Sequence, residues 1–161
     1  MNPAFSKLDP AQTMGLTICR EAGGEIPSGK IAVGTVILER VDHRDWDGKT
    51  IKEVCLKPRQ FSCYDEADRG YKLTLHMAET WDASIATDFS LNECFGIALG
   101  MIDGRIPRDP ELAAKHCCQY LNPAVAPRTR EAWLSAGMTI IKKIDHHEFF
   151  AEKRHEKGGS K

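Results

Sequence analysis

The sequence predicts a mainly α, α+β fold in which a helical domain carries a small β element. Two Pro-marked starts and two capping boxes indicate helix N-termini, and apolar residues recur at helical spacing after them. The segment HHEFF at residues 146–150 instead indicates a terminal strand or extended segment. With 161 residues, 42% of them hydrophobic and 28% charged, we expect one globular domain over residues 1–150 and a polar, disordered tail at 151–161.

The first two predicted helices flank a double glycine. An Asp-Pro pair at residues 9–10 starts a helix that ends at Gly-Gly 23–24, where we expect the left-handed conformation that glycine adopts readily. The next helix, predicted over residues 27–41, is apolar around most of its surface, which is typical of a central core helix. Gly34 within it would allow a close crossing with a neighbouring helix.

The later elements follow from similar signals. Capping boxes at residues 50–53 and 90–93 each open a helix, and the second helix ends at Asp103-Gly104. Further segments are predicted as an extended segment or short strand at 60–64, a helix at about 73–84, a helical or irregular stretch at 111–120, and a last helix at 129–144.

Charge and hydropathy argue against several classes of protein. The formal net charge is −1, which gives no support for nucleic-acid binding. No apolar run reaches the ~20 residues that span a bilayer. The N-terminus lacks a basic segment followed by an apolar one, so we expect cytoplasmic synthesis without a signal peptide. A monomer is favoured.

The cysteines show no C-x-x-C or zinc-finger spacing. Without a signal peptide they are expected to be reduced and mostly buried, with disulfides as the alternative. We predict no cofactor and no metal, because the adjacent Cys117 and Cys118 would rarely satisfy tetrahedral geometry together. The six are Cys19, Cys55, Cys63, Cys94, Cys117 and Cys118.

Glu21 is the candidate catalytic residue. It lies in the last turn of the first predicted helix, where the helix dipole disfavours a carboxylate by about 0.3–1 kcal/mol. Enclosure by the next helix would raise its pKa, as a general acid near neutral pH requires. Glu25, just past the glycines, could face the same cleft, and a pair of carboxyl groups suggests glycoside cleavage.

Several segments together resemble the SleB/CwlJ cell-wall hydrolase family. REAGGEIPSGKIAVGTVILERV, at residues 20–41, resembles the family's E-A-x-G-E motif and the helix after it. TIKEVCLKPRQFSCY, ALGMIDGRIPRDP, HCCQYLNPAVAP and HHEFF resemble later blocks in the same order, over roughly residues 14–150. The sequence departs from the pattern at Glu39, which replaces an Asn, at residues 111–115, and at Cys117-Cys118.

The resemblance implies a lysozyme-like fold and cleavage of peptidoglycan glycan strands between N-acetylmuramic acid and N-acetylglucosamine. It places the family's catalytic acid at Glu21, acting either by lytic transglycosylation or as a muramidase with a second carboxylate such as Glu25. His116 also falls at a family His position. The predicted substrate-binding residues are Glu25, Gln60, Phe61, Ser62, Tyr120, Asn122 and His147.

Two hypotheses from other classes stay open. A Cys–His amidase would use Cys19 or Cys63 as nucleophile and His116 as base. A non-catalytic glycan-binding or structural module would keep the fold, but Glu21 and the QFS motif argue against it. The absence of a signal peptide and of a wall-binding module is similar to a phage endolysin of a Gram-negative host, which a holin would release to the wall.

Overall fold

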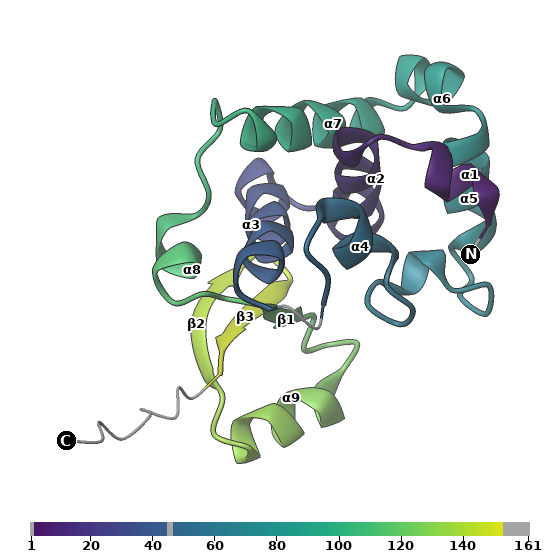
Figure 1. Ribbon diagram of the computed structural model, residues 1–161. Helices are drawn as coiled ribbons and strands as arrows, with labels where there is room; N and C mark the ends of the chain where they lie inside the picture. The colour runs from purple at the N-terminus through teal and green to yellow at the C-terminus, as the bar shows by residue number, and fades with distance from the viewer. Residues whose placement is uncertain (1, 45–46, 153–161) are drawn as a thin grey trace.

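Helices form most of the chain and an antiparallel sheet forms its C-terminal part in the computed structural model, which describes residues 2–44 and 47–152 (Figure 1). The first half contains α1 (Pro3–Lys7), α2 (Pro10–Ala22), α3 (Pro27–His43), α4 (Ile51–Leu56) and the 3₁₀ helix η1 (Ser62–Tyr64). The second half contains α5 (Tyr71–Glu79), α6 (Trp81–Thr87), α7 (Phe89–Ile102), α8 (Pro110–Ala114), β1 (Gln119–Leu121), α9 (Pro127–Ser135), β2 (Thr139–Ile144) and β3 (His147–Ala151).

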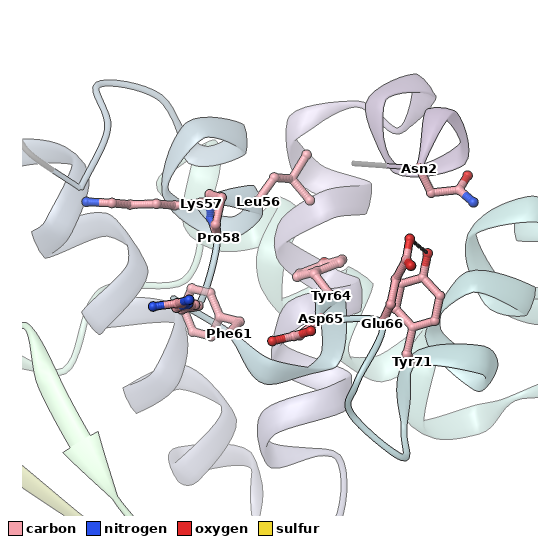
Figure 2. Close-up of a pocket in the computed structure, with 10 residues that line it drawn as sticks. Asn2, Leu56, Lys57, Pro58, Phe61, Tyr64, Asp65, Glu66 and Tyr71 are labelled. Atoms are coloured by element: carbon pink, nitrogen blue, oxygen red, sulfur yellow. Dashed lines mark hydrogen bonds between the residues drawn. The ribbon is translucent and has the colours of Figure 1, made fainter.

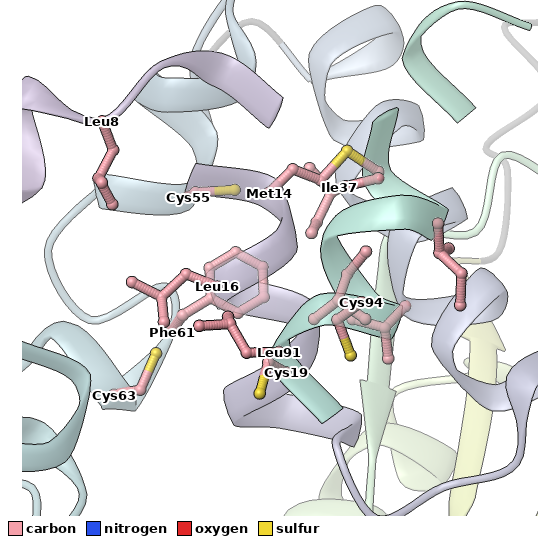
Figure 3. Close-up of a cluster of buried hydrophobic side chains, with 14 of the residues drawn as sticks. Leu8, Met14, Leu16, Cys19, Ile37, Cys55, Phe61, Cys63, Leu91 and Cys94 are labelled. Atoms are coloured by element: carbon pink, nitrogen blue, oxygen red, sulfur yellow. The ribbon is translucent and has the colours of Figure 1, made fainter. Parts of the chain in front are cut away.

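Helix α2 lies at the centre of the helical part and packs against α3, α4 and α7. Its start is fixed by the predicted Asp-Pro signal: the Asp9 side chain accepts from the Gln12 backbone N–H at 2.8 Å, and the Gln12 side chain accepts from the Asp9 N–H. Met14 and Leu16 of α2 are fully buried, and Met14 lies beside Ile37 of α3 (Figure 3). This packing fixes the direction in which the end of α2 points.

Glycines allow the central helices to approach closely. A Cβ on Gly34 of α3 would lie 2.6 Å from the Met101 sulfur, which confirms the predicted close crossing. The prediction for the double glycine is wrong in its detail, because Gly23 adopts right-handed angles of φ −59° and ψ −29°. Glycine is needed at this position for space: a Cβ there would lie 2.4 Å from the Cys19 carbonyl oxygen.

The three-stranded sheet has the order β1-β3-β2 and is antiparallel throughout. Tyr120 of β1 pairs with Phe149 of β3, and the register shifts between Ile140 and Lys142 of β2. A second buried cluster joins the sheet and α8 to the face of α3 that the main core does not use; it comprises Ala32, Val36, Leu112, Cys117, Ile144 and Phe149. Helix α3 therefore lies between the other central helices and the sheet (Figure 1).

Several predicted element types or boundaries are wrong. The helix expected over 129–144 ends at Ser135, because Gly137 turns the chain at φ +84° into strand β2. The segment 60–64 forms the turn of η1 rather than a strand. Helix α7 begins at Phe89, and its N-cap is Asp88, which accepts from the Leu91 N–H at 2.9 Å.

The helix expected over 73–84 is divided at Thr80 into α5 and α6. Residues 111–120 contribute the end of α8 and the start of β1, and the predicted terminal strand is confirmed as β3. Residue 151 of the predicted tail belongs to β3, and the tail from residue 153 lies outside the described residues. Within the described ranges no single helix is long and apolar enough to cross a membrane; α6 and α7 pass that test as a pair, with a bend of 107° between them.

Candidate active site

Glu21 lines a pocket of about 680 Å³ where the end of α2 meets α3, strand β1 and the start of α9. Of the predicted site residues, Glu25, Gln60, Phe61, Tyr120, Asn122 and His147 also line it. Ser62 is exposed at the start of η1 and is not part of the lining. The other lining residues are Arg20, Arg40, Asp47, Arg59, Arg69, Gln119, Leu121, Val125, Ala126 and Trp133.

Glu21 is held by strand β1. The Tyr120 hydroxyl donates a hydrogen bond of 2.9 Å to its Oε2. Burial raises the pKa of Glu21, while the Tyr120 hydrogen bond and the charge of Arg40 act in the opposite direction. The net effect favours the neutral carboxyl group, which is the form that can donate a proton.

Arg40 of α3 organises one wall of the pocket. It is buried, and its Nε donates to the Cys118 carbonyl oxygen at 2.8 Å. Its guanidinium lies 5.2 Å from the centre of the Phe61 ring, within the range of a cation–π contact. With the Gln60 amide oxygen turned toward Arg40, that oxygen accepts from the same guanidinium, for example from Nε at 3.1 Å.

Phe61 packs in the main core (Figure 3) and also lines the pocket. Arg40 is not among the sequence candidates. A charged residue within a helix that is apolar on most sides is the signal that would have found it, since a buried charge needs partners.

His147 of β3 contributes an aromatic wall. Its ring meets the Tyr120 ring edge to face at a centroid distance of 5.3 Å, and Tyr120 stacks on Phe149 at 5.6 Å. Burial lowers the pKa of His147, although the nearby charge of Glu25 opposes that effect. The His147 ring therefore packs against the Tyr120 ring, whose hydroxyl contacts Glu21.

The other two carboxylates of the pocket have basic or imidazole partners. Glu25 Oε2 accepts from the His146 backbone N–H at 3.1 Å, and its Oε1 lies 3.1 Å from His146 Nδ1. Asp47 lies 3.1 Å from Lys57 Nζ and 3.2 Å from Arg44 Nε. Both are thus engaged in holding the walls of the pocket, whereas the hydrogen-bond partner of Glu21 is a phenol.

Asn122 has a local partner and His116 a distant one, and sequence spacing showed neither. The Asn122 Oδ1 accepts from the Ala124 N–H at 2.9 Å and so closes a turn at the pocket rim. His116 does not line the pocket, and its Nδ1 lies 3.2 Å from Glu39 Oε2. Trp133, which the sequence places among the apolar residues of the last helix, instead presents an indole to the pocket.

All six cysteines are unpaired and buried, as predicted. Cys63 is 4% exposed, and burial raises the pKa of its thiol. Cys19 Sγ lies 3.9 Å from Ser90 Oγ on α7, whereas His116 is placed against Glu39. The geometry therefore does not bring the proposed base of a Cys–His amidase to either candidate thiol.

A second pocket, of about 420 Å³, adjoins the first and shares Arg59 and Phe61 with it. Figure 2 shows Leu56, Pro58 and Tyr64 on its walls, with Asp65 and Glu66 at its edge. Arg59 adopts a left-handed φ of 65° between the two pockets, which is unusual for a residue other than glycine. Together the residues that line the two pockets include apolar, acidic and basic side chains.

The fold and the site together define a helical enzyme whose candidate acid is a partly buried carboxyl group in an open cleft. Residues 24–150 match the family described as Cell Wall Hydrolase, and the chain belongs to this family of peptidoglycan-degrading enzymes. The match confirms the resemblance seen in the sequence. Glu21 precedes the matched range, and the other candidate site residues lie within it.

Two solved structures confirm the mainly α fold. The catalytic domain of the germination-specific lytic transglycosylase SleB from Bacillus anthracis is 26% identical, with a TM-score of 0.57 over 88% of this chain and 93% of that chain. The catalytic domain of the Bacillus cereus SleB protein is 24% identical, with a TM-score of 0.54 over 88% of each chain. No curated protein matches the chain.

Proposed function

We propose that the protein is a lytic transglycosylase that cleaves peptidoglycan between N-acetylmuramic acid and N-acetylglucosamine, with Glu21 as general acid and then base. The observation that carries the proposal is the setting of Glu21. It is a pocket carboxyl group with a raised pKa, and its hydrogen-bond partner is the Tyr120 hydroxyl. The structural likeness to a SleB lytic transglycosylase domain supports the same reaction class.

The reaction needs one carboxyl group. Protonated Glu21 donates its proton to the glycosidic oxygen, and the bond to the muramic C1 breaks with oxocarbenium character. The Glu21 carboxylate then accepts the proton of the muramic C6 hydroxyl as that oxygen attacks C1. A 1,6-anhydro ring forms, water is not consumed, and Glu21 returns to its protonated state.

Other lining residues suit the binding of a glycan strand. The Gln60 and Asn122 amides can exchange hydrogen bonds with N-acetyl and hydroxyl groups, and the Trp133 indole offers an apolar face for a sugar ring. The second pocket, beyond Phe61 and Arg59, gives room for further units of the strand. These roles belong to the proposal.

Hydrolysis by a muramidase is the alternative, and it would require a second carboxylate that directs water. Glu25 is the sequence candidate for that role. Its two oxygens are occupied by His146, which favours a part in holding the β2–β3 turn. Origin in a phage and release through a holin stay predictions from the sequence.

Substitution of Glu21 by Gln tests the assignment of the acid. The amide keeps the size and the acceptor for Tyr120 but cannot donate the acidic proton, so we expect about 10²–10⁴-fold slower release of fragments from purified sacculi. Glu25→Gln is the matched control in the same pocket, and under transglycosylation it should retain most of the turnover. More than about a tenth of wild-type activity in Glu21→Gln would remove Glu21 from this role.

The released fragments distinguish the two reactions. Mass spectrometry should show 1,6-anhydro-muramic ends that borohydride does not reduce. Reducible ends heavier by one water would establish hydrolysis, and Glu25→Gln should then be nearly as damaging as Glu21→Gln. Free alanine amino groups without glycan cleavage would contradict both glycosidase hypotheses and favour an amidase.

A further inference from the structure

A second cluster of chemically active side chains lies at the C-terminal end of α3, among residues that do not line the active-site pocket. Glu39 and His43 are one helical turn apart on α3, and His116 reaches them from the segment between α8 and β1. Their potential ligand atoms all lie within 4.8 Å of one another. This cluster is referred to below as the α3 triad.

The two distances from Glu39 to the imidazoles are those expected between neighbouring ligands of one metal ion. Glu39 Oε2 lies 3.2 Å from His116 Nδ1 and 3.4 Å from His43 Nε2. In a tetrahedral site with metal–ligand bonds of about 2.0–2.1 Å, neighbouring ligand atoms are about 3.3–3.4 Å apart. The two imidazole rings are in contact, tilted by 53° at a centroid distance of 4.0 Å, and their potential ligand nitrogens lie within 4.8 Å of each other.

Charge and hydrogen bonding also suit a cation. Glu39 is 2% exposed, and its other oxygen, Oε1, accepts from Arg108 Nη1 at 2.7 Å, which fixes the carboxylate in the way that outer partners fix metal ligands. Arg108 also pairs with Asp42 at 2.7 Å. With neutral imidazoles, two carboxylates and one guanidinium give these groups a net charge of −1, which a divalent cation would offset.

The triad is closed on the protein side and open on the other. Glu39 is buried, whereas the His43 and His116 side chains are 42% and 38% exposed. A cation therefore has a path of entry from solvent, and water can complete its coordination. His116 adopts a left-handed φ of 49°, which holds its ring toward the two α3 residues.

We propose that Glu39, His43 and His116 bind one divalent transition-metal ion of the zinc type, with water as the remaining ligand. Two imidazoles and a carboxylate are a ligand set that Zn²⁺ and Co²⁺ accept readily. The role is structural. The metal would tie the end of α3 to the segment that leads into β1, and Tyr120 of β1 contacts Glu21. This site departs from the sequence-based expectation of no metal, which weighed His116 together with Cys117 and Cys118 and not with Glu39 and His43.

Titration of the EDTA-treated protein, residues 1–161, with Zn²⁺ and Co²⁺ tests the site. At pH 7.5 we expect one equivalent of Zn²⁺ to bind by calorimetry and to raise the melting temperature. Co²⁺ should give the visible absorption of a tetrahedral N/O site. Binding should weaken at pH 5.5, because the imidazoles must be neutral to bind the metal. Absence of one-equivalent binding to the wild-type protein would overturn the proposal.

Variants locate the metal. His43→Ala and His116→Ala should each weaken Zn²⁺ binding at least about 100-fold, since loss of an outer partner alone costs about 10–100-fold. Both side chains are partly exposed, so circular dichroism should show unchanged folds. His76→Ala, on the exposed face of α5, is the matched control and should bind as the wild type does.

Two further results would place the ion elsewhere and overturn the assignment. Loss of binding in His146→Ala would locate it at the Glu25–Asp145–His146 cluster, whose ligand atoms also lie within 4.8 Å of one another. A near-ultraviolet sulfur-to-cobalt charge-transfer band would locate it at a cysteine such as Cys117 or Cys118.

Discussion

At the scale of the residue, the acid–base character of Glu21 follows from two opposed effects. Burial disfavours the carboxylate, and the Tyr120 hydroxyl stabilises it through a 2.9 Å hydrogen bond. Burial is the larger effect, so the pKa is raised. The Tyr120 hydrogen bond makes this rise in the pKa smaller, and it also orients the carboxyl group in the pocket.

Tyr120→Phe tests this balance. The variant removes the donor that stabilises the carboxylate, so the pKa of Glu21 should rise further. A general acid must be protonated, and the basic limb of the pH profile of kcat/KM should therefore move to higher pH than in the wild type. A basic limb that stays in place, or moves to lower pH, would contradict the role of this hydrogen bond. Turnover on purified sacculi across a pH series is the measurement.

The raised pKa of Glu21 also has a consequence for stability. Between the ordinary value of 4.5 and the folded-state pKa, the folded protein holds more protons on Glu21 than the unfolded chain does. The free energy of unfolding should therefore fall as pH rises through that window. Glu21→Gln lacks this titration, so its stability relative to wild type should increase with pH from below 4.5 to neutrality.

Urea unfolding of both proteins at a series of pH values measures the difference. Glu25→Gln is the control, since it changes another carboxyl group of the same pocket. A difference between Glu21→Gln and wild type that is constant over the series would show that Glu21 is not a proton-binding site perturbed by folding.

Sequence analysis locates Glu21 because its position is a local feature, at the end of one helix and before a glycine pair. It does not find the residues that make the environment of Glu21 from far along the chain. Tyr120 is predicted as a sugar contact and is the hydrogen-bond partner of Glu21, and Arg40 is missed. Contacts of this kind depend on how β1 docks against α3, which no local pattern encodes.

At the scale of the element, the contact between α2 and α7 has no room for a side chain at Gly15. A Cβ there would lie 2.8 Å from the Phe95 Cα, and backbone cannot yield as a flexible side chain can. Gly96, the next residue on α7 after Phe95, faces open space, since a Cβ there would meet no other described group within 4 Å. Packing therefore requires glycine at position 15 but not at position 96.

Alanine substitutions should separate these two glycines. Gly15→Ala should destabilise the protein by about 1–3 kcal/mol, because overpacking forces the helices apart. Gly96→Ala should stabilise it by about 0.5–1 kcal/mol, because alanine favours a helix interior. The free energy of unfolding in urea measures both. A Gly15→Ala protein as stable as wild type would contradict the packing at this crossing.

Element boundaries are predicted well where a cap or proline marks them and poorly where tertiary contacts decide. The starts of α2, α3 and α4 follow the Asp-Pro, Pro-Ser and Thr-Ile-Lys-Glu signals. The error at 129–144 arises because the apolar residues also fit a helical period. Gly137 and the β-branched residues of TII at 139–141 carry the opposing signal, and pairing with β3 favours the strand.

At the scale of the whole molecule, α3 couples the helical part to the sheet. Val33 and Ile37 belong to the main core, whereas Ala32 and Val36 pack against the sheet and α8. The pocket lies where these two parts meet, with Glu21 contributed by the helices and Tyr120 and His147 by the strands. The site residues therefore keep their relative positions only while both cores are packed.

The buried thiols can be used to test whether both cores are intact, because a thiol reagent should modify five of them only when the protein unfolds locally or globally. Burial raises the pKa of Cys55 and Cys117 to about 12 and that of Cys118 to about 11. Cys63 and Cys94 are buried as well, with raised pKa values. Thiolates are the reactive form, so a native protein at pH 8 should protect these five.

Cys19 is the exception and supplies the internal control. A hydrogen bond with Cys94 lowers the pKa of its thiol to about 7, against the effect of burial. At pH 8 a thiol reagent should modify Cys19 first and the other five at the rate of unfolding, and all six should react in denaturant. Cys19→Ser should remove the first phase and leave the slow one. Rapid native modification of Cys63, with matching loss of lytic activity, would contradict a purely structural role and reopen the amidase hypothesis.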